Sequence, residues 1–432
     1  MLNNSVKFLD LIFNHKINKT LDLFWLGVVI YFAGFTLSTT TTVSYIICQL
    51  SQLLGILLFL PTAINLIHWK FDNKYLKIVF IIYCSWQLSV ISRGFSFEYE
   101  DLKSYLFDVD GGVFRYFVPL ILLFPKNIFI YKKIYNVIFI LGILFIIYTV
   151  LFFNNLMNLN YINNDTKFTF EHFTKILSVP IGFIFLTFLY HSNRKKIFAA
   201  LIITLSVVFA IIRARRTLLF MNITPLLFTF MFYLSIGKRK FLILIFSLIL
   251  GSSIFLYGIK IYNENKNGVF SLLTERVYED TRTNVEDCLY EDMNNIDWII
   301  GKGINGKYYC SGIDLNDNSG YRKMIETEYL NIILKGGVIS LGLLLLILIP
   351  AIVKGVFYSN NLLSKAAAIW ILIWVLELYP ANVYSFCLNH ILVWISVGIC
   401  YSKSIRKIPE SVLLRILSND SLIRKRKVIF SI

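Results

Sequence analysis

The chain has 432 residues, of which 57% are hydrophobic, and its mean hydropathy is +0.67. Soluble domains are usually about 45–50% apolar, so this composition excludes an ordinary soluble protein. The formal net charge of +16 does not indicate nucleic-acid binding, because the Lys and Arg residues lie in short loops and in the tail rather than in a basic domain.

Apolar runs long enough to cross a bilayer recur from one end of the chain to the other. A membrane β-barrel would show short alternating segments instead, and the sequence lacks them. We therefore predict an all-α integral membrane protein with about 12 transmembrane helices, at residues 21–38, 43–67, 75–92, 112–125, 131–153, 176–191, 196–212, 217–235, 240–257, 328–353, 364–380 and 386–402.

These spans divide the chain into four parts: a membrane bundle of about nine helices (1–257), a hydrophilic loop (258–327), three further membrane helices (328–402) and a basic tail (403–432). Lys and Arg gather at the N-terminus, in alternate short loops and in the tail. The positive-inside rule therefore predicts that both termini are cytoplasmic and that the large, net acidic loop is extracytoplasmic.

The segment Arg213-Ala214-Arg215-Arg216 interrupts a long apolar run, and no acidic residue is close to it in the sequence. It joins the seventh and eighth predicted spans and therefore faces outward, against the charge rule. One explanation is that these side chains only reach the lipid headgroups. The other is a binding site, because guanidinium groups suit phosphate and diphosphate. If a helix continued through the segment, Arg213 and Arg216 would share a face.

The large loop carries the remaining candidate features. Cys288 and Cys310 are 22 residues apart in an oxidising compartment, and the sequence leaves open whether they form a disulfide. The segment from Gly301 to Gly306 matches a dinucleotide-binding pattern, but no βαβ unit surrounds it, so we interpret its glycines as tight turns. The five His residues are dispersed, and we expect no metal site.

Two acidic residues, Glu326 and Glu328, open the tenth predicted span. Acidic residues at a helix N-terminus stabilise the helix, which is the simpler explanation for both. The alternative is that one of them is a buried functional carboxylate at the membrane boundary.

A long outer loop with a Gly-x-Gly turn is followed by Glu326-Thr327-Glu328-Tyr329-Leu330 and then by the Gly-rich stretch from Ile333 to Gly342. This arrangement resembles the O-antigen polymerase and O-antigen ligase superfamily, and the segment from Arg213 to Thr217 resembles that family's outward Arg motif. Glu326 stands where the ligase pattern has His, and Thr327 replaces Asn, so the chain is more similar to the polymerase branch.

The resemblance implies a GT-C-like architecture and a metal-independent glycosyltransferase without a cofactor. The donor would be an undecaprenyl-diphosphate-linked oligosaccharide, polymerised at the outer (periplasmic) face of the bacterial inner membrane into O-antigen or a related surface polysaccharide. Arg213 and Arg216 would stabilise the leaving diphosphate, and Glu326 would orient or deprotonate the acceptor hydroxyl. Further substrate-binding candidates are Arg215, Arg115, Arg322 and Tyr329.

Besides membrane lipids, the implied partners are a chain-length regulator and a flippase of the same pathway. An O-antigen ligase, which transfers glycan to lipid A-core, is the closest alternative among enzymes. The main alternative outside the enzymes is a lipid-linked sugar flippase or another transporter. Transporters often contain internal repeats, which we do not find between the two halves of this sequence.

Overall fold

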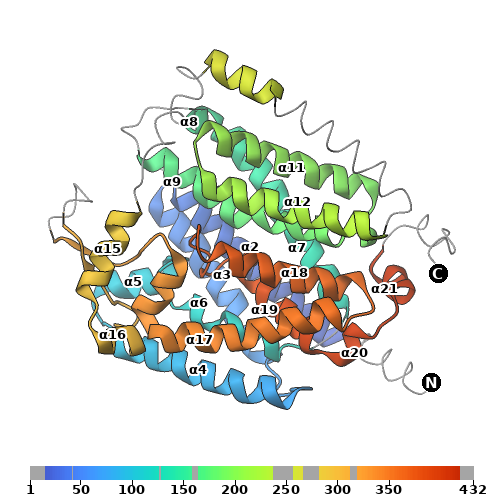
Figure 1. Cartoon of the computed structure of the whole chain (residues 1–432), viewed down its shortest axis with the longest axis horizontal. Coiled ribbons are helices and arrows are strands. Elements are labelled where there is room, and N and C mark those ends of the chain that lie inside the picture. Colours follow the sequence, from blue (N-terminus) through green and yellow to red (C-terminus); the bar gives the residue numbers. More distant parts are fainter. Residues whose placement is uncertain are drawn as a thin grey trace. The chain divides into compact units, whose positions relative to one another are not determined.

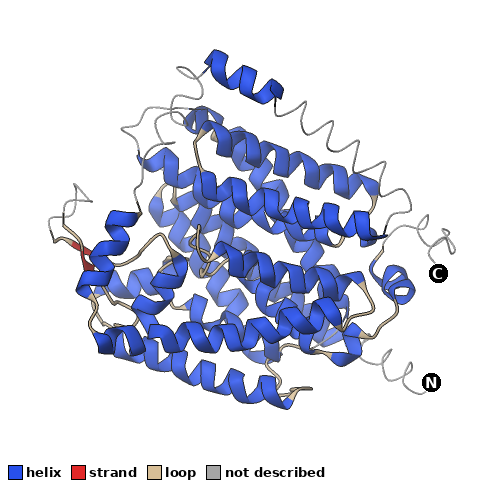
Figure 2. Cartoon of the chain, viewed as in Figure 1, coloured by secondary structure: helices blue, strands red, loops and turns tan. Residues whose placement is uncertain are grey.

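The computed structural model describes residues 15–40, 42–125, 128–157, 164–236, 256–265, 282–311 and 319–418. Of these residues 79% are helical, and one antiparallel sheet of two short strands is described among them (Figure 2). The chain divides into two compact units, which we call the first unit (Met1–Ile138 with Asp280–Ile432) and the second unit (Phe139–Glu279).

The coarse part of the predicted fold class is confirmed: the described chain is almost wholly helical, and its long apolar helices are those of an all-α membrane protein. The GT-C-like architecture stays a prediction. Within the described residues, eight helices are long and apolar enough to span a bilayer, namely Ile17–Ser38, Tyr45–Leu66, Lys74–Gly94, Ile130–Leu151, Thr169–Leu186, Asn193–Ile212, Arg216–Ser235 and Glu328–Phe357. They correspond to eight of the twelve predicted spans.

The other four predicted spans are not established as full crossings. The spans at 112–125 and 386–402 correspond to the shorter apolar stretches Phe114–Leu123 and Leu388–Tyr401. The span at 364–380 corresponds to a helix of 16 residues. Nearly all of the span at 240–257 lies outside the described residues.

The first unit contains most of the elements, and Figure 1 labels its α-helices. Its elements are α2 (His15–Ser38), α3 (Tyr45–Leu66), α4 (Lys74–Gly94), α5 (Tyr99–Phe107), α6 (Phe114–Phe117), η1 (Val118–Leu123), the start of α7 (Ile128–Leu151), α15 (Thr283–Asp292), α16 (Asn295–Ile300), β1 (Tyr308–Tyr309), β2 (Tyr321–Arg322), α17 (Glu328–Phe357), α18 (Leu362–Glu377), α19 (Leu388–Tyr401), α20 (Lys403–Arg406) and α21 (Glu410–Leu417).

Small residues let the first two helices approach closely. A Cβ atom on Gly27 of α2 would lie 2.6 Å from the backbone nitrogen of Phe59, and one on Gly55 of α3 would lie 2.8 Å from the carbonyl oxygen of Gly27. Glycine at both positions therefore allows backbone-to-backbone packing, which is typical of helix pairs in membranes.

The long helix α17 is the element around which the first unit is organised. It lies beside α4 and packs against α18 and α19 as well (Figure 1). It is broken at Gly337, whose φ of 69° and ψ of 178° are not helical. This backbone conformation is essentially restricted to glycine. The break separates a short half-helix, Glu328–Gly336, from the apolar remainder of α17.

Three backbone carbonyls next to this break find hydrogen-bond donors outside the helix. The N–H of Lys302 donates to the carbonyl of Leu334 at 2.7 Å, and the N–H of Gly303 donates to that of Lys335 at 2.9 Å. The indole N–H of Trp86 on α4 donates to the carbonyl of Gly336 at 2.9 Å. Polar backbone groups exposed by a break must be satisfied internally in a membrane protein, and these three donors satisfy them.

The glycines of the segment from Gly301 to Gly306 therefore make tight turns, as predicted. Gly301 and Gly303 have φ values of 72° and 81°. A Cβ atom on Gly301 would lie 2.4 Å from the backbone nitrogen of Gly336, so only glycine allows the turn to approach the broken helix.

The described parts of the large hydrophilic loop fold onto the half-helix of α17. We call residues 282–311 and 319–327 the outer cap, because they cover this half-helix. Its buried apolar residues pack with three residues of the half-helix, the complete set being Val285, Leu289, Met293, Tyr308, Cys310, Ile325, Leu330, Ile333 and Leu334. The half-helix is thus fixed by the cap on its apolar side.

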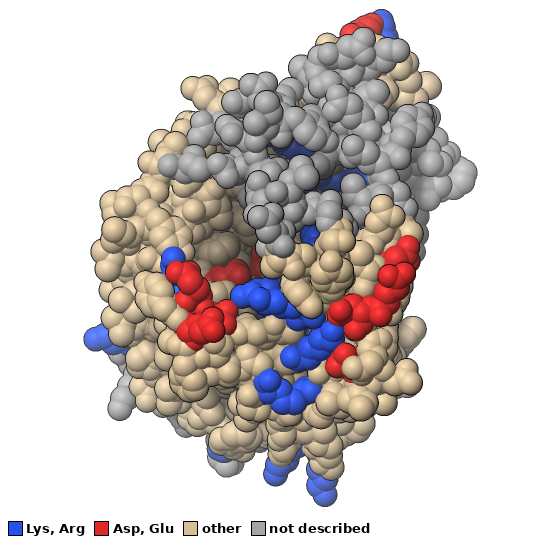
Figure 3. Space-filling model, turned by 90° about the vertical axis from the view of Figure 1, so that its left-hand side faces the viewer, with Lys and Arg blue, Asp and Glu red and all other residues tan. Residues whose placement is uncertain are grey.

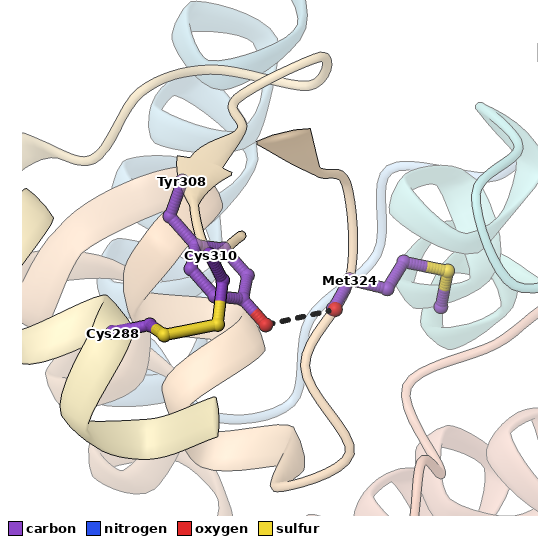
Figure 4. Close-up of a disulfide and its surroundings, with 4 residues drawn as sticks. All are labelled: Cys288, Tyr308, Cys310 and Met324. Atoms are coloured by element: carbon purple, nitrogen blue, oxygen red, sulfur yellow. Dashed lines mark hydrogen bonds between the residues drawn. A yellow bond between two sulfur atoms is a disulfide. The ribbon is translucent and has the colours of Figure 1, made fainter. Parts of the chain in front are cut away.

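A disulfide joins Cys288 of α15 to Cys310, which follows β1 (Figure 4). This was one of the two states that the sequence left open. Beside the disulfide, the hydroxyl of Tyr308 donates to the carbonyl of Met324 at 3.4 Å. Burial raises the pKa of Tyr308 to about 12, so its hydroxyl stays protonated as a donor near neutral pH. Covalent and hydrogen bonds together hold the two sides of the cap.

The second unit contains the end of α7 and a chain of shorter elements. These are α8 (Phe153–Met157), α9 (Asn164–Phe173), the π-helix η2 (Thr174–Ser178), η3 (Val179–Ile181), α10 (Gly182–Leu186), η4 (Phe188–Tyr190), α11 (Asn193–Ile212), α12 (Arg216–Ile236) and a helix at 256–265. The span predicted at 176–191 is therefore a series of short helical turns. Pro180 lies among them and cannot donate a backbone hydrogen bond.

Candidate functional site

A cavity lined mostly by polar side chains lies in the first unit between α4, α6, α17 and Tyr384. Its volume is about 10 Å³, which is room for about one water molecule. The lining includes three charged residues, Arg115, Glu328 and Lys335, and their polar neighbours include Asn331, Ser340 and Tyr384.

The three charged residues of the cavity are buried. Arg115, Glu328 and Lys335 are 1%, 0% and 5% exposed. Burial of a charge costs free energy unless the charge is paired and hydrogen-bonded, so such groups are unusual without a partner or a function. The charges of Arg115 and Glu328 attract each other.

The two terminal nitrogens of the Arg115 guanidinium are hydrogen-bonded, whereas its Nε atom is not hydrogen-bonded to any described residue. One terminal nitrogen donates to the carbonyl of Asp110, and the other donates to the hydroxyl of Tyr116 at 2.9 Å. The group also lies over the rings of Tyr116 and Tyr384, at 4.8 and 5.7 Å from their centroids. Its Nε atom is buried and has no acceptor in the described part of the chain. A ligand with acceptor oxygens could take this donor.

The half-helix of α17 supplies the facing groups. Residues 328, 331 and 335 are three and four positions apart, so they lie on one face of the helix. The amide of Asn331 donates to Glu328 at 3.2 Å. The amide oxygen of Asn331 is buried and has no donor among the described residues. A ligand hydroxyl could therefore donate a hydrogen bond to the amide oxygen of Asn331. A second hydroxyl of the same ligand could donate to the carboxylate of Glu328.

Lys335 connects the cavity to the outer cap. Its ammonium group donates to the carbonyls of Gly306 and Lys323, both at 2.7 Å. These two carbonyls belong to separate segments of the cap, so one buried side chain holds both segments close to the cavity wall. The ammonium group has three N–H bonds, and these two acceptors leave the third for another partner.

Of the residues proposed from the sequence for substrate and catalysis, only Arg115 lines this cavity. The buried carboxylate is Glu328 rather than the proposed Glu326, whose side chain is 62% exposed and lies 3.7 Å from the Nε atom of Arg282. Tyr329 stacks on Tyr379 with ring centroids 6.3 Å apart and does not line the cavity.

Arg322 lies outside the cavity as well. It belongs to β2, where it pairs with Tyr308 of β1. Sequence reasoning did not select Asn331 and Lys335. The signal that could have identified them is their helical spacing from Glu328, within a span that is otherwise almost wholly apolar.

The arginine segment belongs to the second unit. Arg215 has an acidic partner from a distant part of the sequence, because it lies 3.3 Å from Glu171. A helix does not continue through the segment, because α11 ends at Ile212 and Ala214 has a φ of 53°, so the condition for a face shared by Arg213 and Arg216 is not met. The N–H groups of Ala214 and Arg215 donate to earlier carbonyls of α11, which is the Schellman arrangement of a helix end.

The three arginines consequently differ in their surroundings. Arg213 is 7% exposed, and its Nε atom donates to the carbonyl of Leu156 at 2.7 Å. Arg215 is partly buried beside Glu171. Arg216 is exposed at the first residue of α12. Arg213 therefore fastens two segments of the second unit, and Arg216 is the arginine most open to a ligand.

Charged side chains of both signs gather on the side of the molecule where α5, α15 and α16 lie (Figure 3). Lys302 pairs with Asp292 and Asp297, and Lys323 lies 3.0 Å from Asp101 of α5. Burial alone would raise the pKa of Asp101. Hydrogen bonds from Lys323 and Ser96 and the nearby positive charges outweigh that effect, so this pKa lies below its usual value. The ion pair therefore fastens the cap to α5.

Among the described residues, no group of three or more His, Cys, Asp or Glu side chains could hold a metal ion. No known family, no characterised protein and no solved structure matches this chain. The chemistry has to be argued from the cavity itself.

Proposed function

We propose that the protein is a membrane glycosyltransferase that uses a polyprenyl-diphosphate-linked oligosaccharide as its donor. It joins repeat units of a surface polysaccharide such as O-antigen at the extracytoplasmic face of the bacterial inner membrane. The observation that carries the proposal is the burial of Arg115 and Glu328 in one cavity, together with an unused donor on Arg115 and an unused acceptor on Asn331.

The proposed reaction needs one base and at least one cation. The acceptor hydroxyl oxygen attacks the anomeric carbon of the donor, and the bond from that carbon to the diphosphate oxygen breaks. The hydroxyl proton passes to the carboxylate of Glu328, and the bonding electrons leave with the diphosphate. The products are a lengthened glycan and a lipid diphosphate, so the activated donor supplies the free energy of the step.

Arg115 is assigned to the developing charge on the leaving diphosphate. Fixed cations in a water-poor site stabilise such charge more strongly than they would in water, because the local dielectric constant is low. Arg115 is held in place by Asp110 and Tyr116 before any ligand binds. The positive charge of Arg115 favours an anionic ligand.

The arginine segment of the second unit has a narrower role in this proposal. Arg213 stabilises the fold through Leu156, and the charge of Arg215 is partly offset by Glu171. The exposed Arg216 is the member of the segment that we propose for binding an anionic headgroup.

The test is to delete the gene and express variants in its place, with the surface polysaccharide separated on a gel. We expect wild-type protein to restore a ladder of long chains. Glu328→Gln and Arg115→Lys should leave single repeat units on the core, because loss of a general base alone costs about 10²–10⁴-fold in rate. Glu326→Gln is the matched control, since its carboxylate is exposed, and it should restore the ladder.

Three outcomes would contradict the proposal. A full ladder from Glu328→Gln at normal membrane levels would exclude this carboxylate as the base. A deletion strain that carries no glycan on its core, while lipid-linked polymer accumulates, would indicate a ligase. A deletion strain that accumulates unpolymerised lipid-linked repeats, with no glycan on its core, would indicate a flippase.

A further inference from the structure

A tight turn at residues 108–113 joins α5 to α6 and leads directly to Arg115. The carboxylate of Asp108 accepts the N–H of Asp110 at 2.9 Å with one oxygen and the N–H of Gly111 at 3.0 Å with the other. A Cβ atom on Gly111 would lie 2.6 Å from the Asp108 carboxylate, and one on Gly112 would lie 2.0 Å from the Asp108 carbonyl. The turn is therefore built tightly around Asp108.

The shape of this turn determines where Arg115 points. The carbonyl of Asp110 accepts a hydrogen bond from the guanidinium, and the neighbouring carbonyl of Val109 accepts the N–H of Phe386 at 2.8 Å. The turn is thus fastened on one side to the segment that carries Tyr384 and on the other side to Arg115. A shift of the Asp110 carbonyl would move the guanidinium within the cavity.

We propose that Asp108 is a positioning residue for Arg115, and that only its ionised carboxylate holds the turn in the shape that aims the guanidinium into the cavity. The role rests on the proposed function, because Arg115 is assigned there to the leaving diphosphate. An ionised carboxylate can accept both N–H groups of the turn. A protonated carboxyl keeps one carbonyl oxygen, but its hydroxyl oxygen is a much weaker acceptor, so one of the two hydrogen bonds is weakened. The amide of asparagine has an NH₂ donor in place of one acceptor oxygen, so one of the two hydrogen bonds is lost.

This requirement makes the site sensitive to acid. Burial raises the pKa of Asp108, and the negative charge of Asp110 raises it further. The two backbone N–H groups and the positive charge of Arg115 oppose that rise without cancelling it. The charged or titratable groups that face Asp108 are Asp110 in the same turn, Arg115 on α6 and Tyr31 on α2.

The direction of the pKa shift separates this effect from unfolding. The carboxyl of Asp108 protonates at a higher pH than an ordinary aspartate, whose pKa is about 3.9. A raised pKa in the folded state means that protonation of Asp108 favours the folded state. Weaker anion binding in mild acid would therefore reflect a misplaced Arg115 rather than loss of the fold. Protonation of Glu328 acts in the opposite direction, because it removes negative charge from the cavity.

The test uses the full-length protein in detergent and inorganic diphosphate as the probe, with affinity measured by calorimetry and the fold checked by thermal unfolding. At neutral pH we expect Asp108→Asn to bind about tenfold more weakly than wild type, which corresponds to the loss of about one hydrogen bond. Comparison at equal pH cancels the titration of the probe. On acidification the affinities of wild type and variant should converge. The matched control is Glu100→Gln on α5, whose exposed carboxylate should leave affinity unchanged at both pH values.

A double-mutant cycle distinguishes positioning from general support of the fold. In an Arg115→Met background, Asp108→Asn should have no further effect on diphosphate affinity. The proposal is overturned if Asp108→Asn binds as wild type does, if the two affinities stay apart on acidification, or if Arg115→Met alone leaves binding unchanged. These measurements need no turnover, so they can succeed or fail independently of the polysaccharide gel that tests the proposed function.

Discussion

The break in α17 gives the sharpest stability prediction. Replacing Gly337 by alanine places a side chain in a backbone conformation that costs about 1–3 kcal/mol for any residue other than glycine. The added Cβ would also lie 1.9 Å from the carbonyl oxygen of Ile299, so the backbone there must move. Overpacking of this kind costs about another 1–3 kcal/mol. We expect Gly337→Ala to lower the free energy of unfolding by about 3 kcal/mol, measured by denaturant titration of the protein in detergent.

The same helix offers a control with the opposite expected sign. Apart from the neighbouring backbone of its own helix, a Cβ atom on Gly342 would meet nothing within 4 Å, and this glycine lies in the regular part of α17. Alanine is a better helix former than glycine by about 1 kcal/mol, so Gly342→Ala should leave stability unchanged or raise it. If Gly337→Ala proved as stable as Gly342→Ala, the positive φ and the close approach of the outer cap would both be refuted.

Three other predictions concern the cap and the arginine segment. The loop closed by the disulfide spans 22 residues, so Cys288→Ser should lower stability by about 3 kcal/mol, and reductant should do the same to wild type but not to the variant. The lowered pKa of Asp101 means that its ion pair stabilises the protein above about pH 3.9 and that this stability is lost in stronger acid. Asp101→Asn should therefore flatten the acid part of a curve of unfolding free energy against pH. An unchanged curve would contradict the ion pair. Arg213→Ala should destabilise the second unit, which limited proteolysis would detect, because it leaves a buried carbonyl without its donor; Arg216→Ala, at an exposed position, should not.

The helices were predictable where the signal is local. A long apolar run indicates a span regardless of its neighbours, and eight predicted spans correspond to helices of sufficient length. The break in α17 was not predicted, because the stretch from Glu328 to Phe357 is hydrophobic enough as a whole to be read as one continuous span. A pair of glycines permits a positive φ but does not require one. The requirement comes from the cap, whose N–H groups satisfy carbonyls of the half-helix.

The candidate site was predictable only in part, for a similar reason. Glu326 and Glu328 have similar neighbours in the sequence. They differ in the structure because the helix begins between them: Thr327 is its N-cap, so Glu326 lies before the helix and Glu328 inside it. The partner of Arg215 was missed because Glu171 lies on a different element. Contacts between elements are set by how the elements pack, so they cannot be predicted from the composition or residue spacing of one segment.

The half-helix of α17 couples the outer cap to the cavity, because it contributes side chains to both. Glu328, Asn331 and Lys335 face the cavity, and Leu330, Ile333 and Leu334 pack into the cap. Movement of the cap would therefore rotate or shift the proposed base. A loss of activity on reduction of the disulfide would not by itself place the cysteines at the reacting atoms, because the same loss follows from displacement of Glu328.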